Sequence, residues 1–200
     1  MTDMMAEIAA FDGLTAKIVG PARSGKTEAL LRRAAAAVAA GCAPEDILIE
    51  TSTAEAARVA RRRLVDALAA AGMQDVEDIA GRITVACAQQ VCLAVLETPE
   101  ARAATGRTPR VLAPFEHNFF LEDMKTLGTP ARRLRSELGH VKKQWCALAP
   151  EDDWAVGEEK DVLELAHRLL GATNAMLEDE VAYLCGRYLQ SDAGAGARQR

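Results

Sequence analysis

An eight-residue stretch, Gly20 to Thr27, constrains this chain more than any other part of its sequence. It reads Gly-Pro-Ala-Arg-Ser-Gly-Lys-Thr, which fits the pattern of a glycine, four free positions and Gly-Lys-Thr. Apolar Ile18 and Val19 precede it, and a helix-forming run from Glu28 to Ala40 follows. A turn that leads into a helix offers an anion unpaired backbone N–H groups and the positive end of the helix dipole. The stretch therefore predicts a phosphate-binding loop for a nucleotide.

Each residue type in this loop suits one part of a magnesium-bound triphosphate. Gly25 lets the backbone come close, the Lys26 ammonium would reach the β- and γ-phosphates, and the Thr27 hydroxyl would bind Mg²⁺. We therefore predict ATP and Mg²⁺ as cofactors, Lys26 and Thr27 as catalytic residues, and Thr27 as the metal ligand. The predicted cofactor-binding residues are Gly20, Pro21, Ala22, Arg23, Ser24, Gly25, Lys26, Thr27 and Glu28. Arg23 is unusual, because a bulky cation there either adds a phosphate contact or alters the path of the loop.

The length and composition of the chain limit the classes of protein to which it can belong. The 200 residues, half of them hydrophobic, allow one ordinary domain, or one domain with a sub-domain, and an ample core. A net charge of -5 argues against a protein that holds nucleic acid by bulk charge. The sequence has neither an apolar run of membrane-spanning length nor the basic start of a secretion signal. We expect a cytoplasmic monomer with no membrane contact.

The cysteines and histidines are scattered, without the short paired spacings of a zinc site. They are Cys42, Cys87, Cys92, Cys146, Cys185, His117, His140 and His167. An odd number of isolated cysteines favours buried, reduced thiols over a disulfide framework. We expect each histidine at the surface or at a helix cap.

The first half of the chain alternates between strand and helix patterns. The predicted strands are Ala16 to Val19, Ile47 to Glu50 and Ile83 to Cys87, and the predicted helices are Lys26 to Ala40, one opening at a Ser52/Glu55 capping box and reaching Ala71, and Gln89 to Leu96. Gly41 suits a left-handed C-cap. Such alternation predicts an α/β fold with a parallel sheet and with the phosphate loop at the carboxyl edge of its strands.

The second half reads as helical throughout. We predict helices over Phe115 to Leu127, Pro130 to Leu148, Glu158 to Leu170 and Asn174 to Leu189, with Phe119, Phe120 and Met124, and later Val162, Leu165 and Leu169, on apolar faces. The predicted division is 1–100 for a P-loop NTPase portion, 101–190 for a helical sub-domain and 191–200 for a loose tail.

Three segments in this order resemble the N-terminal ATP-binding region of UvrD/PcrA/Rep-type superfamily 1 DNA helicases. They are Gly20 to Thr27, Ile47 to Ala57 and Ile83 to Leu93. The resemblance implies a partial RecA-like parallel sheet, an inserted all-helical sub-domain 1B, and ATP-dependent DNA helicase activity with a role in DNA repair. It also implies single-stranded DNA as a partner, with contacts at Thr51, Thr53, Cys87 and Gln89.

Two departures from the family pattern change what is expected. The family reads adenine with a glutamine upstream of the loop, and residues 1–19 contain none, so we expect poor discrimination between ATP and GTP. Ala88 stands where the family has an aromatic residue that could stack on a base, so we expect weak contact with DNA.

Hydrolysis of ATP needs an acidic residue at Mg²⁺ and a group that orients water. The sequence after Lys26 has no apolar strand ending in Asp-Glu, and Glu178-Asp179-Glu180 reads as an exposed acidic helix turn. We therefore expect an N-terminal fragment, ending before the family's Walker B strand, that binds ATP without turnover. Two alternatives are a small P-loop kinase, with a lid from Arg132, Arg133 and Arg135, and a non-catalytic interaction module.

Overall fold

The computed structural model describes residues 7, 8, 10, 11, 13, 15–125 and 130–199, which fall into two units. Unit 1 is Met1–Ala88 and unit 2 is Gln89–Arg200. Most described residues are helical, and one small parallel sheet lies in unit 1. All helices in the described parts of the chain fall short of the length and apolarity that crossing a bilayer requires.

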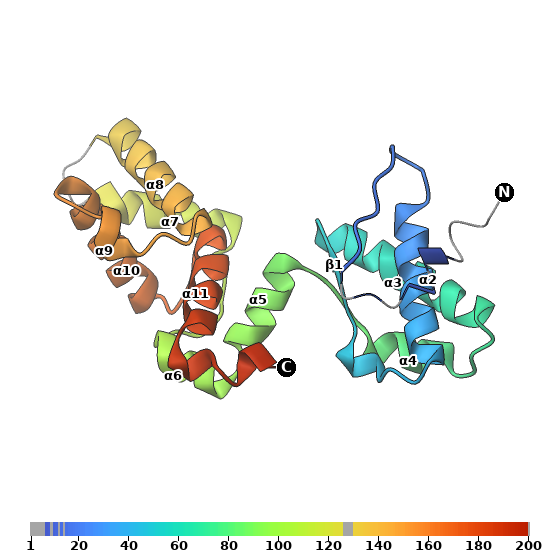
Figure 1. The fold of residues 1–200 in the computed structure, drawn as a ribbon. Coiled ribbons are helices and arrows are strands. Elements are labelled where there is room, and N and C mark those ends of the chain that lie inside the picture. The colour runs from blue at the N-terminus through green and yellow to red at the C-terminus, as the bar shows by residue number, and fades with distance from the viewer. Residues whose placement is uncertain (1–6, 9, 12, 14, 126–129, 200) are drawn as a thin grey trace. The chain divides into compact units, whose positions relative to one another are not determined.

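Unit 1 is built on a parallel pair of strands joined through helices (Figure 1). Its elements are α2 (Lys26–Ala39), η1 (Pro44–Asp46), β1 (Leu48–Thr51), α3 (Ala54–Ala70), α4 (Val76–Arg82) and β2 (Thr84–Cys87). The register pairs Leu48 with Thr84 and Thr51 with Cys87, so both strands end at the same edge. The predicted parallel pairing of the second and third strands is confirmed. Gly41, just after α2, has the predicted left-handed backbone, with φ of 97°.

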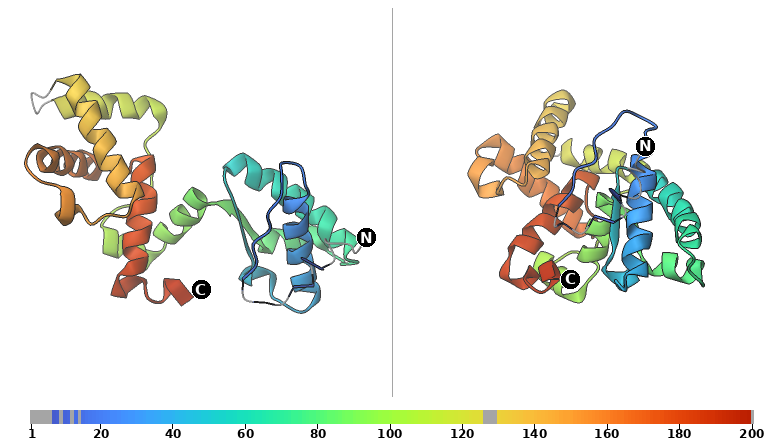
Figure 2. Two further views of the ribbon diagram at one scale, coloured as in Figure 1. Left: turned by 45° about the horizontal axis from the view of Figure 1, so that its top comes forward. Right: turned by 45° about the vertical axis from the view of Figure 1, so that its right-hand side comes forward.

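One apolar cluster joins the sheet of unit 1 to its helices. Its buried members include Leu31 of α2, Ala57, Ala60, Leu64, Ala67 and Leu68 of α3, Ile49 of β1 and Val85 of β2. The α3 residues recur at the spacing of one helical face. Each fully buried leucine contributes about 2 kcal/mol of hydrophobic stabilisation. Helix α3 therefore holds α2 and both strands together (Figure 2).

The predicted strand Ala16 to Val19 is wrong. These residues form no ladder in the structure, and Val19 is 81% exposed. The segment instead lines a cavity of about 500 Å³ with Phe11 and with Leu30 of α2. An apolar run becomes a strand when another strand pairs with it, since its propensity reports a fit to a half-buried sheet surface. Here the run is short and includes Lys17.

The predicted capping box at Ser52 is also wrong. The N-cap of α3 is Thr53, whose hydroxyl oxygen accepts a hydrogen bond from Ala56 N at 3.1 Å. Glu55, which the box would turn back to the N-cap, forms an ion pair with Arg58. The helix begins one residue later than predicted because Thr53 has the extended backbone that an N-cap requires.

Unit 2 is helical. Its elements are α5 (Ala88–Leu96, which begins at the last residue of unit 1), α6 (Pro99–Thr105), α7 (Pro114–Met124), α8 (Ala131–Cys146), α9 (Glu151–Trp154), α10 (Glu158–Ala172), α11 (Glu178–Gln190), η3 (Asp192–Gly194) and η4 (Ala197–Gln199). An isolated parallel bridge joins Val111 to Met176. Helix α8 packs against α10 and α11. The four helices predicted for the second half are present with shifted ends; residues 126 and 127, which the first of them was predicted to include, lie outside the described residues.

The predicted apolar face of α7 is wrong at Phe119, whose side chain is 67% exposed. Phe120 and Met124, four residues apart, are both buried in the main cluster of unit 2. Adjacent helical residues project about 100° apart, so Phe119 cannot share their face. On α10, Val162 and Leu165 are buried and Leu169 packs against the same cluster, as predicted.

The loose tail over 191–200 stays a prediction; among its described residues, Ser191 caps η3, and the buried Gly194 lies so close to the Tyr188 carbonyl that a Cβ would clash. The expectation of buried thiols differs from the structure at two cysteines. Cys42 and Cys146 are exposed rather than buried, since they lie in the turn after α2 and at the last residue of α8.

Candidate functional site

The backbone of the predicted phosphate loop turns sharply into α2. Gly25 is the N-cap, with φ of 85°, and Ala29 N donates to its carbonyl at 2.9 Å. Arg23 also has a left-handed backbone, with φ of 62°, which is uncommon for a residue other than glycine. A Cβ on Gly20 would lie 2.6 Å from Ser24 Oγ, so the two ends of the turn approach as closely as a glycine permits.

The Lys26 ammonium is bound by its own loop. Its Nζ donates to the carbonyl of Gly20 at 2.8 Å and to that of Pro21 at 2.6 Å, and it lies 3.3 Å from Ser24 Oγ. An ammonium has three N–H donors, so these contacts use its full capacity. They fold the loop around the amine at the start of α2. A phosphate oxygen that binds Lys26 must therefore replace loop carbonyls.

The first turn of α2 leaves its backbone donors without a side-chain cap, because the N-cap Gly25 has no side chain. Thr27 is exposed in this turn, so its hydroxyl is accessible to a metal ion. The helix has 14 residues, long enough for its dipole to favour an anion at this end. Pro21 and Ala22 are exposed as well, so the loop is open to a ligand from solvent.

Glu28, the acid in this first turn, binds two arginines. Its carboxylate accepts from Arg32 Nε at 3.0 Å and from Arg63 Nη2 of α3 at 2.9 Å. The hydrogen bond from Arg32 lowers the pKa of Glu28; slight burial opposes this, and Arg63 adds to it. The ionised carboxylate thus links α2 to α3 inside unit 1.

Three of the four residues predicted to contact DNA lie together where β1 and β2 end. Thr51 and Cys87 are directly paired in the register, and Thr53 follows as the α3 N-cap. Thr51 Oγ1 donates to the Thr53 carbonyl at 2.9 Å, and Cys87 is buried. The Thr53 hydroxyl accepts from Ala56 N, so the hydroxyls of Thr51 and Thr53 both already make hydrogen bonds to backbone groups. Gln89 lies in the first turn of α5 and belongs to unit 2.

The basic residues of α3 are also partly engaged. Arg61 donates to the Val85 carbonyl at 3.3 Å, Arg58 pairs with Glu55, and Arg63 pairs with Glu28. These contacts leave part of each guanidinium in solvent, where it can still attract a phosphate backbone.

The acidic segment that sequence reasoning placed on an exposed helix turn is partly buried. Glu180 is fully buried, and Arg107 Nη1 donates to its Oε1 at 2.6 Å. Leu177 N donates to the other oxygen at 3.2 Å. Burial raises the pKa of Glu180, and the charges of Arg107 and His167 oppose the shift. Asp179 pairs with Lys142 at 2.8 Å, so two of the three acids have partners within unit 2.

A partly buried polar network extends from Glu180, and the sequence did not predict it. Arg107 Nη2 donates to His167 Nδ1 at 2.9 Å, and His167 Nε2 lies 3.0 Å from a Glu151 oxygen. Trp145 Nε1 donates to Glu151 at 2.8 Å. Burial works against the ionised form of Glu151, but the hydrogen bonds from His167 and Trp145 prevail and lower its pKa. The His167 side chain is 31% exposed and also bonds to Arg107 and Glu151, contacts that the expectation of a surface or cap residue did not include.

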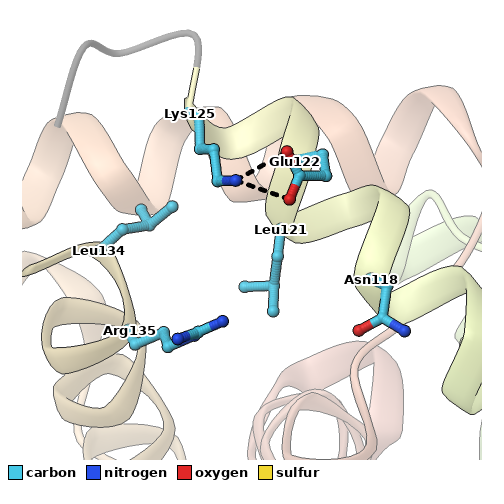
Figure 3. Close-up of a pocket in the computed structure, with 6 residues that line it drawn as sticks. All are labelled: Asn118, Leu121, Glu122, Lys125, Leu134 and Arg135. Atoms are coloured by element: carbon cyan, nitrogen blue, oxygen red, sulfur yellow. Dashed lines mark hydrogen bonds and ion pairs between the residues drawn. The ribbon is translucent and has the colours of Figure 1, made fainter. Parts of the chain in front are cut away.

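The arginines considered for a kinase lid lie on α8. Arg133 pairs with Glu137 and Glu158, and Arg135 lines a small cavity of about 160 Å³ between α7 and α8. Figure 3 shows Arg135 and Leu134 facing Leu121 of α7, with Lys125 bonded to both oxygens of Glu122. Arg133 and Arg135 are both exposed, and Arg133 forms its ion pairs within the helical unit.

In a comparison with protein families, the model of the UvrD/REP helicase N-terminal domain matches residues 2–182. No curated protein matches the chain. The matched range includes the loop, both strands and the first residues of α11.

Proposed function

We propose, from the premise that the chain belongs to the family of UvrD/REP helicase N-terminal domains, that it binds Mg-ATP as part of a UvrD-like DNA helicase or translocase. The observation that carries the proposal is the Lys26 amine, held at the N-terminus of α2 by a Gly-x-x-x-x-Gly-Lys-Thr loop within the matched range. In this proposal unit 1 is a part of a RecA-like P-loop domain. The helices within residues 101–190 are the family's helical sub-domain.

Binding of the triphosphate proceeds by exchange at Lys26. Its ammonium gives up the carbonyls of Gly20 and Pro21 and donates to phosphate oxygens, which are ionised and therefore stronger acceptors. The backbone N–H groups at the start of α2 donate hydrogen bonds to the same phosphates. The exposed Thr27 hydroxyl supplies one ligand to Mg²⁺, whose charge offsets that of the phosphates. Glu28 keeps α2 in place through Arg32 and Arg63.

Single-stranded DNA binds weakly at the strand ends in this proposal. Thr51 and Thr53 lie beside the paired Cys87, and the arginines of α3 supply positive charge nearby. Gln89 would add a contact from α5. The affinity comes from phosphates, because Ala88 offers no ring for a base to stack on.

The chain by itself leaves the bound nucleotide intact in this proposal. Hydrolysis requires a carboxylate at Mg²⁺ and charge that meets the γ-phosphate as it leaves. Glu180 and Asp179, the nearest match to such acids in the sequence, already pair with Arg107 and Lys142.

Titration calorimetry with Mg-ATP tests the proposal. Lys26→Ala should weaken binding about 100-fold, because charge-assisted hydrogen bonds to phosphate contribute roughly 2 to 3 kcal/mol. Lys160→Ala is the matched control, since that lysine is exposed on α10 and makes one long ion pair with Glu164. EDTA should weaken binding by the wild type and by the Lys26 variant, because both keep the Thr27 hydroxyl as a ligand for Mg²⁺. Equal affinity of the wild type and Lys26→Ala would refute nucleotide binding at this loop.

A further inference from the structure

The small cavity between α7 and α8 has apolar side chains beside polar ones (Figure 3). Leu121 of α7 and Leu134 of α8 line its volume of about 160 Å³. Both leucines pack against the main apolar cluster of unit 2, so their positions are fixed by the fold. A cavity of about 150 Å³ holds a molecule the size of benzene. The space therefore suits one short, branched aliphatic group.

The charged groups of the cavity leave one positive charge unanswered. Lys125 Nζ donates to both oxygens of Glu122, at 2.6 and 2.7 Å, so these two charges offset each other. The Arg135 guanidinium extends from α8 towards Leu121 (Figure 3). Within the described parts of the chain, neither Arg135 nor the amide of Asn118 has a hydrogen-bond partner. The cavity therefore offers a guanidinium and an amide as unused donors.

We propose that this cavity binds a monocarboxylate that carries a short branched aliphatic group, as in isovalerate or the C-terminal leucine of a peptide. Arg135 binds the carboxylate, because a planar guanidinium can donate two parallel N–H···O hydrogen bonds to it. The Asn118 amide donates to a remaining lone pair of the carboxylate. The aliphatic group packs against Leu121 and Leu134. The site lies in unit 2 and does not depend on the proposed function of the nucleotide loop.

The local charges favour a monoanion over a phosphate dianion or a nucleic-acid backbone. One unpaired guanidinium balances one negative charge, while Glu122 on the cavity wall and the exposed Asp123 beside it repel a second. A phosphodiester also has no aliphatic group to cover the two leucines. Acetate, which has the charge and lacks the branched group, should bind about tenfold more weakly than isovalerate.

The test titrates the full chain, labelled at its leucine methyl groups, with sodium isovalerate at constant ionic strength. The methyl resonances of Leu121 and Leu134 should shift and saturate with a Kd of about 1 mM, as expected for so small a ligand. Arg135→Gln should weaken binding at least about tenfold, because it removes the charge-assisted hydrogen bonds. Arg132→Gln is the matched control, since that exposed arginine lies on the same helix and does not line the cavity. Isovaleramide, which has the same shape without the charge, should also bind at least about tenfold more weakly.

A second titration distinguishes a free acid from a protein C-terminus as the source of the carboxylate. An acetylated peptide that ends in leucine is compared with the same peptide bearing a C-terminal amide. Tighter binding of the acid peptide than of isovalerate, lost on amidation, identifies a protein C-terminus. Binding of isovalerate that equals or exceeds that of the peptide identifies a free acid.

Three results would overturn the carboxylate site. The first is the absence of a saturable shift at isovalerate concentrations well above the expected Kd. The second is equal binding of isovaleramide, which would show that the cavity accepts the aliphatic group without reading the charge. The third is a loss in Arg132→Gln as large as that in Arg135→Gln, which would assign the effect to the general charge of α8.

Discussion

Replacing Arg107 by methionine should destabilise unit 2 more than any comparable change at its surface. The substitution removes the guanidinium that donates to Glu180 at 2.6 Å and keeps most of the side chain's length. Glu180 is fully buried, and Arg107 is 11% exposed. The variant therefore leaves a carboxylate in the protein interior without its ion-pair partner.

The size of the expected loss of stability follows from the burial of the Arg107–Glu180 ion pair. Breaking a buried ion pair by removing one partner costs about 3 to 5 kcal/mol, because the remaining charge stays desolvated. Arg107 also donates to His167 Nδ1 and to the Ala175 carbonyl, so the loss reaches α10 and the loop before α11. Arg110→Met is the matched control. Arg110 pairs with Glu116, but it is 45% exposed, and exposed pairs contribute about 1 kcal/mol or less.

The loss of stability caused by Arg107→Met should depend on pH. Burial already raises the pKa of Glu180 in the folded protein, and Arg107 opposes that shift, so the variant raises it further. A raised pKa means that the folded state binds more protons than the unfolded state between the two pKa values. Stability is therefore lost as the pH rises through that range. The free energy of unfolding of the variant should therefore fall furthest below that of the wild type at pH 8, and this difference should shrink towards pH 5.

Urea unfolding followed by circular dichroism at pH 8 and pH 5 measures these differences. Glu180→Gln in the Arg107→Met background should recover part of the loss at pH 8, because the amide carries no charge. A loss in Arg107→Met no larger than that in Arg110→Met would refute the reasoning. So would a deficit that is equal at both pH values.

Three further outcomes are expected. Thr53→Ala should reduce the stability of unit 1 by about 1 kcal/mol in urea unfolding, whereas Ser52→Ala should leave it unchanged; the reverse order would restore Ser52 as the cap. Fluorescence anisotropy with labelled single-stranded DNA should show weak binding that falls steeply as salt rises, and tight binding at high salt would contradict a phosphate-based contact. A phosphate-release assay should give background turnover with or without DNA. DNA-stimulated turnover that Lys26→Ala abolishes would reveal a catalytic carboxylate outside the acids considered.

Local signals in the sequence predicted the parts of the fold that depend on local interactions. The loop before α2 has a motif whose glycines and lysine specify a turn and a helix start. The run Ile47 to Ile49 is continuously apolar, Ile83 to Cys87 is apolar except at Thr84, and the strands that these two segments form pair in parallel. Helices α8 and α10 show clear apolar periodicity. These features were predictable because neighbouring residues determine them.

Features that depend on distant partners were not predictable. Nothing near Glu180 in the sequence indicates that Arg107 approaches it from another part of unit 2, so the acid reads as exposed. His167 likewise gains its role from Glu151 and Arg107. The run at Ala16 to Val19 reads as a strand because the pattern records apolarity and not the presence of a pairing neighbour. The spacing of apolar residues does not reveal polar networks inside helical units, because one polar residue on an apolar helix face changes the pattern very little.

In the proposed function, the hydrogen bonds that Lys26 makes within its own loop would compete with the nucleotide for the amine. The carbonyls of Gly20 and Pro21 lie within hydrogen-bonding distance of the Lys26 Nζ and belong to the same chain, so their effective concentration is high at any protein concentration. The apparent affinity for the nucleotide would then be the intrinsic affinity multiplied by the fraction of molecules in which the amine is released. Substitutions that loosen the turn, such as a glycine in place of Pro21, would change this fraction without touching the ligand. Nucleotide affinity could thus be tuned through the stiffness of a peptide turn.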